Sequence, residues 1–153
     1  MEASELCYLS LRSLGTLMQR RELSPVEATE TVLDRVEKFD RQLNSFITPL
    51  RDQAMAQARA AEREILDGHY RGPLHGVPIA AKDLYYTKGI RTTAGSKILS
   101  DFIPTYDATV IARLQDAGAI LIGKLNMHEF ARGATNSSSL IGGCYNEVFS
   151  ISV

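Results

Sequence analysis

A lysine closes a short apolar stretch near the middle of the chain, and its position makes it the leading candidate for chemistry. The stretch, Val77–Ala81, is too short for an isolated helix and is typical of a strand that is buried on both faces. In parallel α/β sheets, ligands bind beyond the carboxyl ends of the strands, and Lys82 falls at that end. The alternative is that Lys82 only marks where the strand leaves the core, since lysines are rarely buried without a partner.

The other residues with chemically versatile side chains are poorly placed for metal or thiol chemistry. Zinc sites bring together several His, Cys or acidic ligands, and none of the three histidines stands at such a spacing: His69, His75 and His128. Cys7 and Cys144 are far apart in the sequence and fit no metal or redox motif. We therefore expect no metal and no organic cofactor.

The composition limits the classes of function. A chain of 153 residues is one domain, or a piece of a larger one, and its net charge of −1 argues against nucleic acid or an anionic membrane as the main partner. The N-terminus carries Glu2 and Glu5, and no stretch reaches the apolar length of a membrane span. We expect a cytoplasmic chain that binds neither nucleic acid directly nor a membrane.

The first part of the chain, residues 1–71, predicts a layer of helices. Apolar residues at near-helical spacing predict a helix over Ser4–Arg21. The sequence Ser24-Pro25-Val26-Glu27 is typical of the start of a helix, with serine as the N-cap, proline at the first helical position and glutamate at the third. That helix is expected to continue to Leu43. A third helix is expected over Asp52–Asp67, with a glycine after it.

The second part, residues 72–153, predicts the sheet that these helices cover. Asp107 is expected to cap a helix, which leads through a glycine into a second apolar strand at Ala119–Gly123. Helix, glycine and buried strand form the closing half of a βαβ unit. A helical turn or two are expected over Lys124–Ala131. The predicted fold class is α/β, with N-terminal helices packed on the start of a mixed or parallel sheet.

Several short motifs together resemble the amidase signature family. They occur in the family's order and spacing: Gly76–Pro78, Lys82–Asp83, Gly95–Ser96, Asp107–Ala108, Ala117–Ala119, Gly123–Lys124, Asn126, Glu129–Phe130 and Gly133. The segment Thr87–Thr93 is similar to the tRNA-dependent amidotransferases, a branch of this family, whereas His128 departs from that branch. General amidase and amidotransferase therefore both stay open.

The resemblance implies hydrolysis of amide bonds by a Ser-cisSer-Lys triad, in which Lys82 is the catalytic lysine. A neutral lysine takes a proton from a bridging serine, which activates the nucleophilic serine. Burial among apolar neighbours favours the neutral form of a lysine, and we expect the Lys82 side chain to be buried or half-buried. The implied partners are a small amide substrate and, for an amidotransferase, further subunits.

The resemblance ends near the C-terminus. Asn146 matches the start of an Asn-Pro-Trp element, but Glu147–Val153 does not continue the pattern, and the family's two serines would follow later. Ser137–Ser139 lies upstream, where a polar loop is the simpler interpretation. We therefore interpret residues 1–153 as the N-terminal portion of a single amidase domain. The alternative is a truncated, inactive relative that acts at most as a binding or interaction module.

Overall fold

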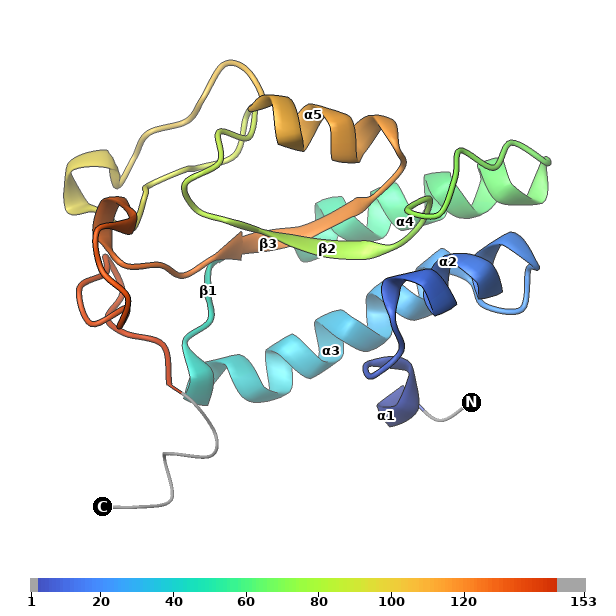
Figure 1. The fold of residues 1–153 in the computed structure, drawn as a ribbon, viewed down its shortest axis with the longest axis horizontal. Coiled ribbons are helices and arrows are strands. Elements are labelled where there is room, and N and C mark those ends of the chain that lie inside the picture. Colours follow the sequence, from blue (N-terminus) through green and yellow to red (C-terminus); the bar gives the residue numbers. More distant parts are fainter. Residues whose placement is uncertain (1–2, 146–153) are drawn as a thin grey trace. The chain divides into compact units, whose positions relative to one another are not determined.

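The chain begins with two short helices where the sequence predicts one. The computed structural model describes residues 3–145, and Figure 1 shows their fold. Helix α1 spans Ala3–Leu6 and helix α2 spans Leu11–Gln19. The predicted continuous helix over Ser4–Arg21 is wrong, because Ser10 has an extended backbone and caps α2 by accepting a hydrogen bond from the backbone N–H of Ser13.

The next two helices follow the sequence prediction closely. Helix α3 spans Pro25–Leu43, and the hydroxyl of Ser24 accepts the backbone N–H of Val26 at 2.9 Å, as expected for a serine cap. Helix α4 spans Arg51–Leu66, and Gly68 after it has a φ of 87°. That left-handed conformation is the one that glycine adopts without strain.

Three strands form a mixed sheet, which confirms the predicted α/β class. Strand β1 spans Phe46–Pro49, β2 spans Pro78–Lys82 and β3 spans Ile120–Leu125, in the order β1-β3-β2 (Figure 1). Strand β1 is antiparallel to β3. Strand β2 is parallel to β3, since Ile120 N–H binds Val77 C=O near one end and Asp83 N–H binds Leu125 C=O at the other.

The segments between the strands contain one correction. Helix α5 spans Thr109–Asp116, and two short 3₁₀ helices, η1 and η2, span Lys97–Leu99 and Glu129–Ala131. The prediction that Asp107 caps α5 is wrong, because its carboxylate accepts the backbone N–H of Lys88 at 2.7 Å instead.

The predicted helical turns over Lys124–Ala131 are reduced to η2. Lys124 and Leu125 before it continue strand β3, so the start of the predicted segment is extended and not helical. The backbone at Lys124 is held opposite Thr48 of β1, which gives the extended conformation hydrogen-bonding partners that one isolated helical turn would lack.

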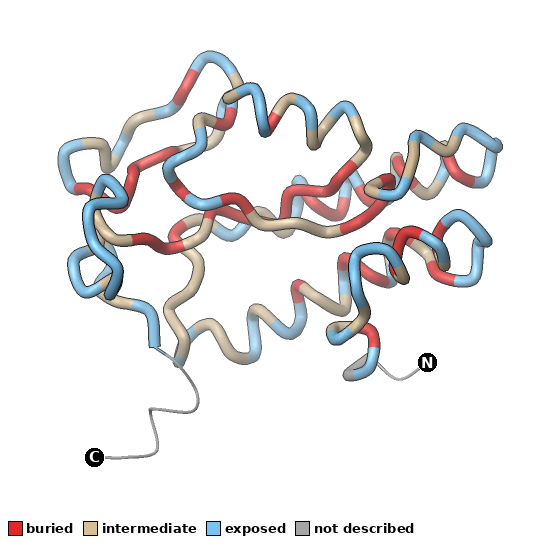
Figure 2. Tube along the Cα trace, viewed as in Figure 1, coloured by how far each residue is buried: buried red, intermediate tan, exposed pale blue. Residues whose placement is uncertain are grey.

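The described residues divide into two compact units. Of residues 3–145, the first unit comprises residues 3–36, 50–79 and 112–122, and the second comprises residues 37–49, 80–111 and 123–145. The core of the first unit is built from seven buried apolar residues: Leu6, Leu14, Met18, Leu23, Ala28, Ile65 and Val77. In the second unit, the largest buried side chain is Lys124. Strand β3, which runs through both units, is buried at every position before Leu125. Figure 2 shows how buried and exposed residues are distributed along the chain.

Gly15 lets α2 approach the chain segment that precedes β2. A Cβ atom added at this position would lie inside contact distance of the backbone carbonyl oxygen of Pro73. Tyr70 also contacts α2 at this position, because its hydroxyl donates to the carbonyl oxygen of Gly15 at 3.0 Å. The glycine therefore serves packing and costs the helix some intrinsic stability.

We predict that Gly15→Ala destabilises the protein even though alanine is the better helix former. The gain in helix propensity of about 1 kcal/mol is outweighed by overpacking against backbone, which typically costs about 1–3 kcal/mol. Urea unfolding of the variant checks this. Thr16→Ala, at an exposed position of the same helix, is the control and should change the free energy of unfolding by less than about 0.5 kcal/mol. A more stable Gly15→Ala variant would contradict the expectation.

Candidate active site

Lys82 is the last residue of β2, at the carboxyl end of a strand that is parallel to β3. This is the edge of the sheet at which the sequence predicts chemistry. The expected burial of the side chain is wrong for this chain, because Lys82 is exposed. The strand order gives the reason: β2 is the last strand of the described sheet and has β3 as its one neighbour there.

A tight turn follows Lys82 and fixes its backbone. The N–H of Tyr85 donates to the carbonyl oxygen of Lys82 at 3.0 Å, which closes a four-residue turn. Within that turn, the backbone N–H of Asp83 donates to Leu125 of β3, and its carbonyl oxygen accepts the N–H of Ala94. The candidate lysine is therefore carried by backbone that is bonded to two other segments.

The carboxylate of Asp83 is fully buried and joins the turn to the segment that contains Thr93. Its Oδ2 accepts the backbone N–H of Thr93 at 2.8 Å and the hydroxyl of the same residue at 2.5 Å. Its Oδ1 accepts no hydrogen bond and lies 3.4 Å from the Nζ of Lys124. One oxygen is thus used for hydrogen bonding and the other for a buried ion pair.

Lys124 lies in the interior of the second unit, and its side chain has no exposed surface. Its Nζ donates to the carbonyl oxygen of Tyr85 at 2.8 Å and to the hydroxyl of Thr92 at 2.7 Å. Burial lowers the pKa of Lys124 from its ordinary value, and the Asp83 carboxylate acts in the opposite direction. An ammonium group with one carboxylate and two further acceptors is well compensated for the loss of water.

Lys124 was not predicted as a site residue, because in the sequence it stands out only as part of a family motif. One signal was available: a lysine directly after the apolar residues of β3, and a Lys-Asp pair at the end of the neighbouring apolar stretch. Two parallel strands that end together bring such opposite charges within reach of one another.

The serine-rich loop forms a polar pocket of about 360 Å³ together with Gly95 and Glu129. The hydroxyl of Ser96 donates to Glu129 at 2.5 Å, and the backbone N–H of Glu129 donates to Ser138. Ser137 and Ser138 are exposed and Ser139 is half-buried. Within the described residues, this loop has the character of a polar wall, as the sequence predicts. Ser150 and Ser152 lie outside the described residues.

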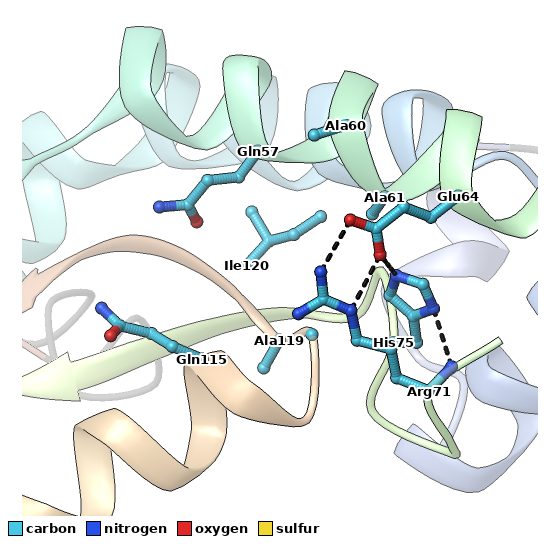
Figure 3. Close-up of a pocket in the computed structure, with 10 residues that line it drawn as sticks. Gln57, Ala60, Ala61, Glu64, Arg71, His75, Gln115, Ala119 and Ile120 are labelled. Atoms are coloured by element: carbon cyan, nitrogen blue, oxygen red, sulfur yellow. Dashed lines mark hydrogen bonds and ion pairs between the residues drawn. The ribbon is translucent and has the colours of Figure 1, made fainter. Parts of the chain in front are cut away.

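A second pocket, of about 240 Å³, belongs to the first unit and contains the histidine nearest to β2 (Figure 3). Arg71 donates through Nε and Nη2 to the two carboxylate oxygens of Glu64, at 2.8 and 2.6 Å. His75 is buried between the same partners: its Nδ1 accepts the backbone N–H of Arg71, and its Nε2 lies 3.2 Å from Glu64. The acceptor role of Nδ1 places the proton of the neutral ring on Nε2.

The thiols and the acidic residues add no further reactive centre among residues 3–145. No group of three His, Cys, Asp or Glu side chains in that range could hold a metal ion. Cys144 donates to the carbonyl oxygen of Asn44, and burial raises the pKa of its thiol, which disfavours the reactive thiolate. None of the described helices is long and apolar enough to cross a membrane.

The fold and the site define an α/β protein that presents a lysine at the carboxyl end of a parallel strand, with a buried Lys-Asp pair beside it. Residues 27–148 match the family model described as Amidase. The chain therefore belongs to the amidase signature family, as the motifs indicated.

Relatives within this family cover almost the whole chain. One is the A-type subunit of the glutamyl-tRNA(Gln) amidotransferase of Geobacter sulfurreducens, which is 50% identical over 142 residues, a match that covers 93% of this chain and 29% of the relative. The corresponding protein of Geobacter sp. strain M21 is 47% identical over the same length. The chain thus spans less than a third of the length of these curated relatives.

Solved structures show the same fold. The native peptide amidase of Stenotrophomonas maltophilia superposes with a TM-score of 0.80 at 36% identity, covering 90% of this chain and 29% of that protein. A fatty acid amide hydrolase reaches a TM-score of 0.89 over 95% of this chain and 26% of its own length. At 23% identity, the second likeness concerns the fold alone.

We predict that the buried histidine makes the first unit sensitive to acid. Burial lowers the pKa of His75 from its ordinary value of 6.5, so the unfolded chain binds a proton there before the folded chain does. The stability that depends on neutral His75 is complete above pH 6.5 and is lost as the pH falls below it. The free energy of unfolding should therefore decrease from pH 7.5 to pH 5.5, by at most ~1.4 kcal/mol per pH unit from this group.

Titration of Glu64 does not reverse the decrease in the free energy of unfolding on acidification. Its pKa is lowered from 4.5, first by the hydrogen bond from Arg71, so its contribution is also lost on acidification, but at lower pH. The measurement is urea unfolding at several pH values. His75→Gln should flatten the decrease, whereas His69→Gln, which replaces an exposed histidine, should leave it unchanged. An unchanged slope in His75→Gln would contradict the assignment.

Proposed function

We propose that this chain contributes the lysine of a Ser-cisSer-Lys triad to an amide-bond hydrolase of the amidase or amidotransferase type, and that Lys82 is that lysine. The observation that carries the proposal is the place of Lys82, at the carboxyl end of a parallel strand and on a turn bonded to two other segments. Membership of the amidase family supports amide hydrolysis as the reaction class.

The chemistry assigned to Lys82 is that of a general base acting through another residue. A neutral lysine amine accepts the proton of the bridging serine as that serine accepts the proton of the nucleophilic serine. The serine oxygen then forms a bond to the amide carbon, the C–N bond breaks, and the nitrogen leaves as ammonia or an amine after taking a proton. Water hydrolyses the resulting acyl-enzyme. In the family pattern, both serines follow the match to Asn146.

The substrate and partners are proposed at a coarser level. A small amide is the expected substrate, and the relatives, which are named as one subunit of an amidotransferase, favour a complex with other subunits. We propose no direct contact of this chain with nucleic acid, since its net charge is −1. Its cytoplasmic location stays a prediction.

A second candidate function is that of an inactive relative which binds a partner protein. The observation that favours it is the sequence after Asn146, which leaves the family pattern. The described edge of β2, which has one strand neighbour, would offer such a module a site for pairing with another strand. Dependence of activity on Lys82 separates the two candidates.

We predict that Lys82→Ala abolishes amide hydrolysis in a hybrid in which residues 1–145 replace the matching segment of the Geobacter sulfurreducens relative. Loss of a general base typically costs about 10²–10⁴ in rate, and more where triad members act as a unit. Ammonia release from glutamine and from simple aryl amides is the measurement. Lys88→Ala, which removes another exposed lysine of the same unit, is the matched control. Activity of Lys82→Ala within a few-fold of the parent hybrid would refute the assigned role.

We predict that the 153-residue chain by itself releases no ammonia above the level of its own Lys82→Ala variant. In the serine-rich loop, Ser137 and Ser139 have no basic side chain as hydrogen-bond partner: Ser137 contacts Thr135, and Ser139 donates to Asn126. Steady-state and burst assays on the purified chain check this. Turnover that Lys82→Ala removes would place a nucleophile within these 153 residues.

A further inference from the structure

We propose that Lys124 is a positioning residue for Lys82: its buried ammonium fastens the turn Lys82–Tyr85 and so fixes the backbone that carries the candidate base. The inference deepens the proposed function and rests on the role of Lys82 proposed there. It concerns a side chain that has no exposed surface and therefore cannot itself reach a substrate in the described structure.

The ammonium of Lys124 joins three segments of the second unit at one point. Lys124 lies on β3, it donates to Tyr85 at the end of the turn, and it donates to Thr92 on the next segment. It also faces the Oδ1 of Asp83, which has no other partner. Two of the three ammonium donors are used in hydrogen bonds to Tyr85 and Thr92, and the Asp83 carboxylate supplies the counter-charge at 3.4 Å.

The contacts of Lys124 bracket Lys82 within its turn. Asp83 follows Lys82 directly, and Tyr85 accepts the Lys124 ammonium through its C=O while its own N–H binds Lys82 C=O. Without the ammonium, the buried Oδ1 of Asp83 would lose its counter-charge, and the Tyr85 carbonyl would lose the shorter of its two side-chain donors, keeping the Thr87 hydroxyl at 3.1 Å. A loosened turn would displace the Lys82 side chain, and misplacement of a catalytic group by about 1 Å can cost on the order of 10²-fold in rate.

A purely stabilising role explains this arrangement less well. Buried ion pairs are weak contributors to stability, because the loss of hydration offsets most of the attraction, and apolar residues of similar size often serve as well. An apolar residue at position 124 could not orient the Tyr85 carbonyl, the Thr92 hydroxyl and the Asp83 carboxylate, which come from the turn and from the next segment. The number and direction of these bonds therefore point to control of geometry.

The test uses the hybrid with a matched set of variants. Lys124→Met keeps the length of the side chain and removes the ammonium, and Lys124→Met combined with Asp83→Asn also removes the unpaired carboxylate in case the single variant does not fold. Lys88→Met, at an exposed position, controls for the loss of one positive charge. For rescue, Lys124→Cys is made in a background with Cys7→Ser and Cys144→Ser, alkylated with 2-bromoethylamine while unfolded, and refolded.

The expected result is a selective loss of kcat. Lys124→Met, or the double variant, should lower kcat about 10²-fold with KM changed less than about threefold, since substrate binding does not depend on the position of the base. Aminoethylation, which restores an ammonium at nearly the same place, should recover kcat to within about tenfold of the parent. A folded variant with parental kcat, or aminoethylation without recovery, would overturn the inference.

A second readout does not depend on activity. In the 153-residue chain, amide hydrogen exchange at position 83, Tyr85 and Ala94 should become at least about tenfold faster in Lys124→Met, or in the double variant relative to Asp83→Asn alone, while exchange at Gly76 and Ile120 of the first unit stays unchanged. Equal acceleration throughout the chain, or none at the turn, would show that Lys124 does not fasten it. If the parent hybrid shows no activity that depends on Lys82, the proposed function fails, and the exchange result still decides the role of Lys124.

Discussion

The ammonium group of Lys124 imposes the strongest constraint on the second unit. Removing a charge from water is costly, and the cost is met here by the carboxylate of Asp83 and by two oxygens from Tyr85 and Thr92. Asp83 and Tyr85 belong to the turn after β2 and Thr92 to the next segment, so the ammonium joins both of these segments to β3. The ammonium acts there together with the backbone bond from Asp83 to Leu125 and the two bonds from Thr93 to Asp83.

The residue before Lys124 allows the close approach of β1 to β3. A Cβ atom at Gly123 would lie 2.6 Å from the ring of Phe46 and 2.9 Å from the carbonyl oxygen of Thr48. The absence of a side chain lets β1 lie close against β3 at this point, with Thr48 opposite Lys124. Arg91 reinforces the contact by donating to Ile47 and Thr48. The glycine therefore lets Phe46 and β1 pack closely against β3, on the face opposite to the Lys124 side chain.

Hydrophobic periodicity and caps were sufficient to predict α3, α4 and the two apolar strands, because those signals are local. They failed where a distant partner decides the outcome. Asp107 is a good helix cap by residue type, yet its carboxylate accepts a hydrogen bond from the backbone N–H of Lys88, which is distant in the sequence. Local patterns also cannot tell which of two lysines at strand ends is enclosed, since that depends on strand order. Lys82 on the outer strand is exposed, and Lys124 on the central strand is buried.

The two lysines differ in the property that the proposed chemistry needs, which is desolvation of the amine together with access to a substrate. A lysine acts as a base only in its neutral form, and desolvation is the usual way to favour that form. Lys124 is desolvated but is paired with a carboxylate and has no access to a substrate, so it suits a fixed charge. The side chain of Lys82 is exposed and could reach a substrate, but the described residues do not shield it from water. Under the proposed function, the groups that enclose Lys82 must lie on the side of β2 away from β3, and the bridging serine must approach from that side.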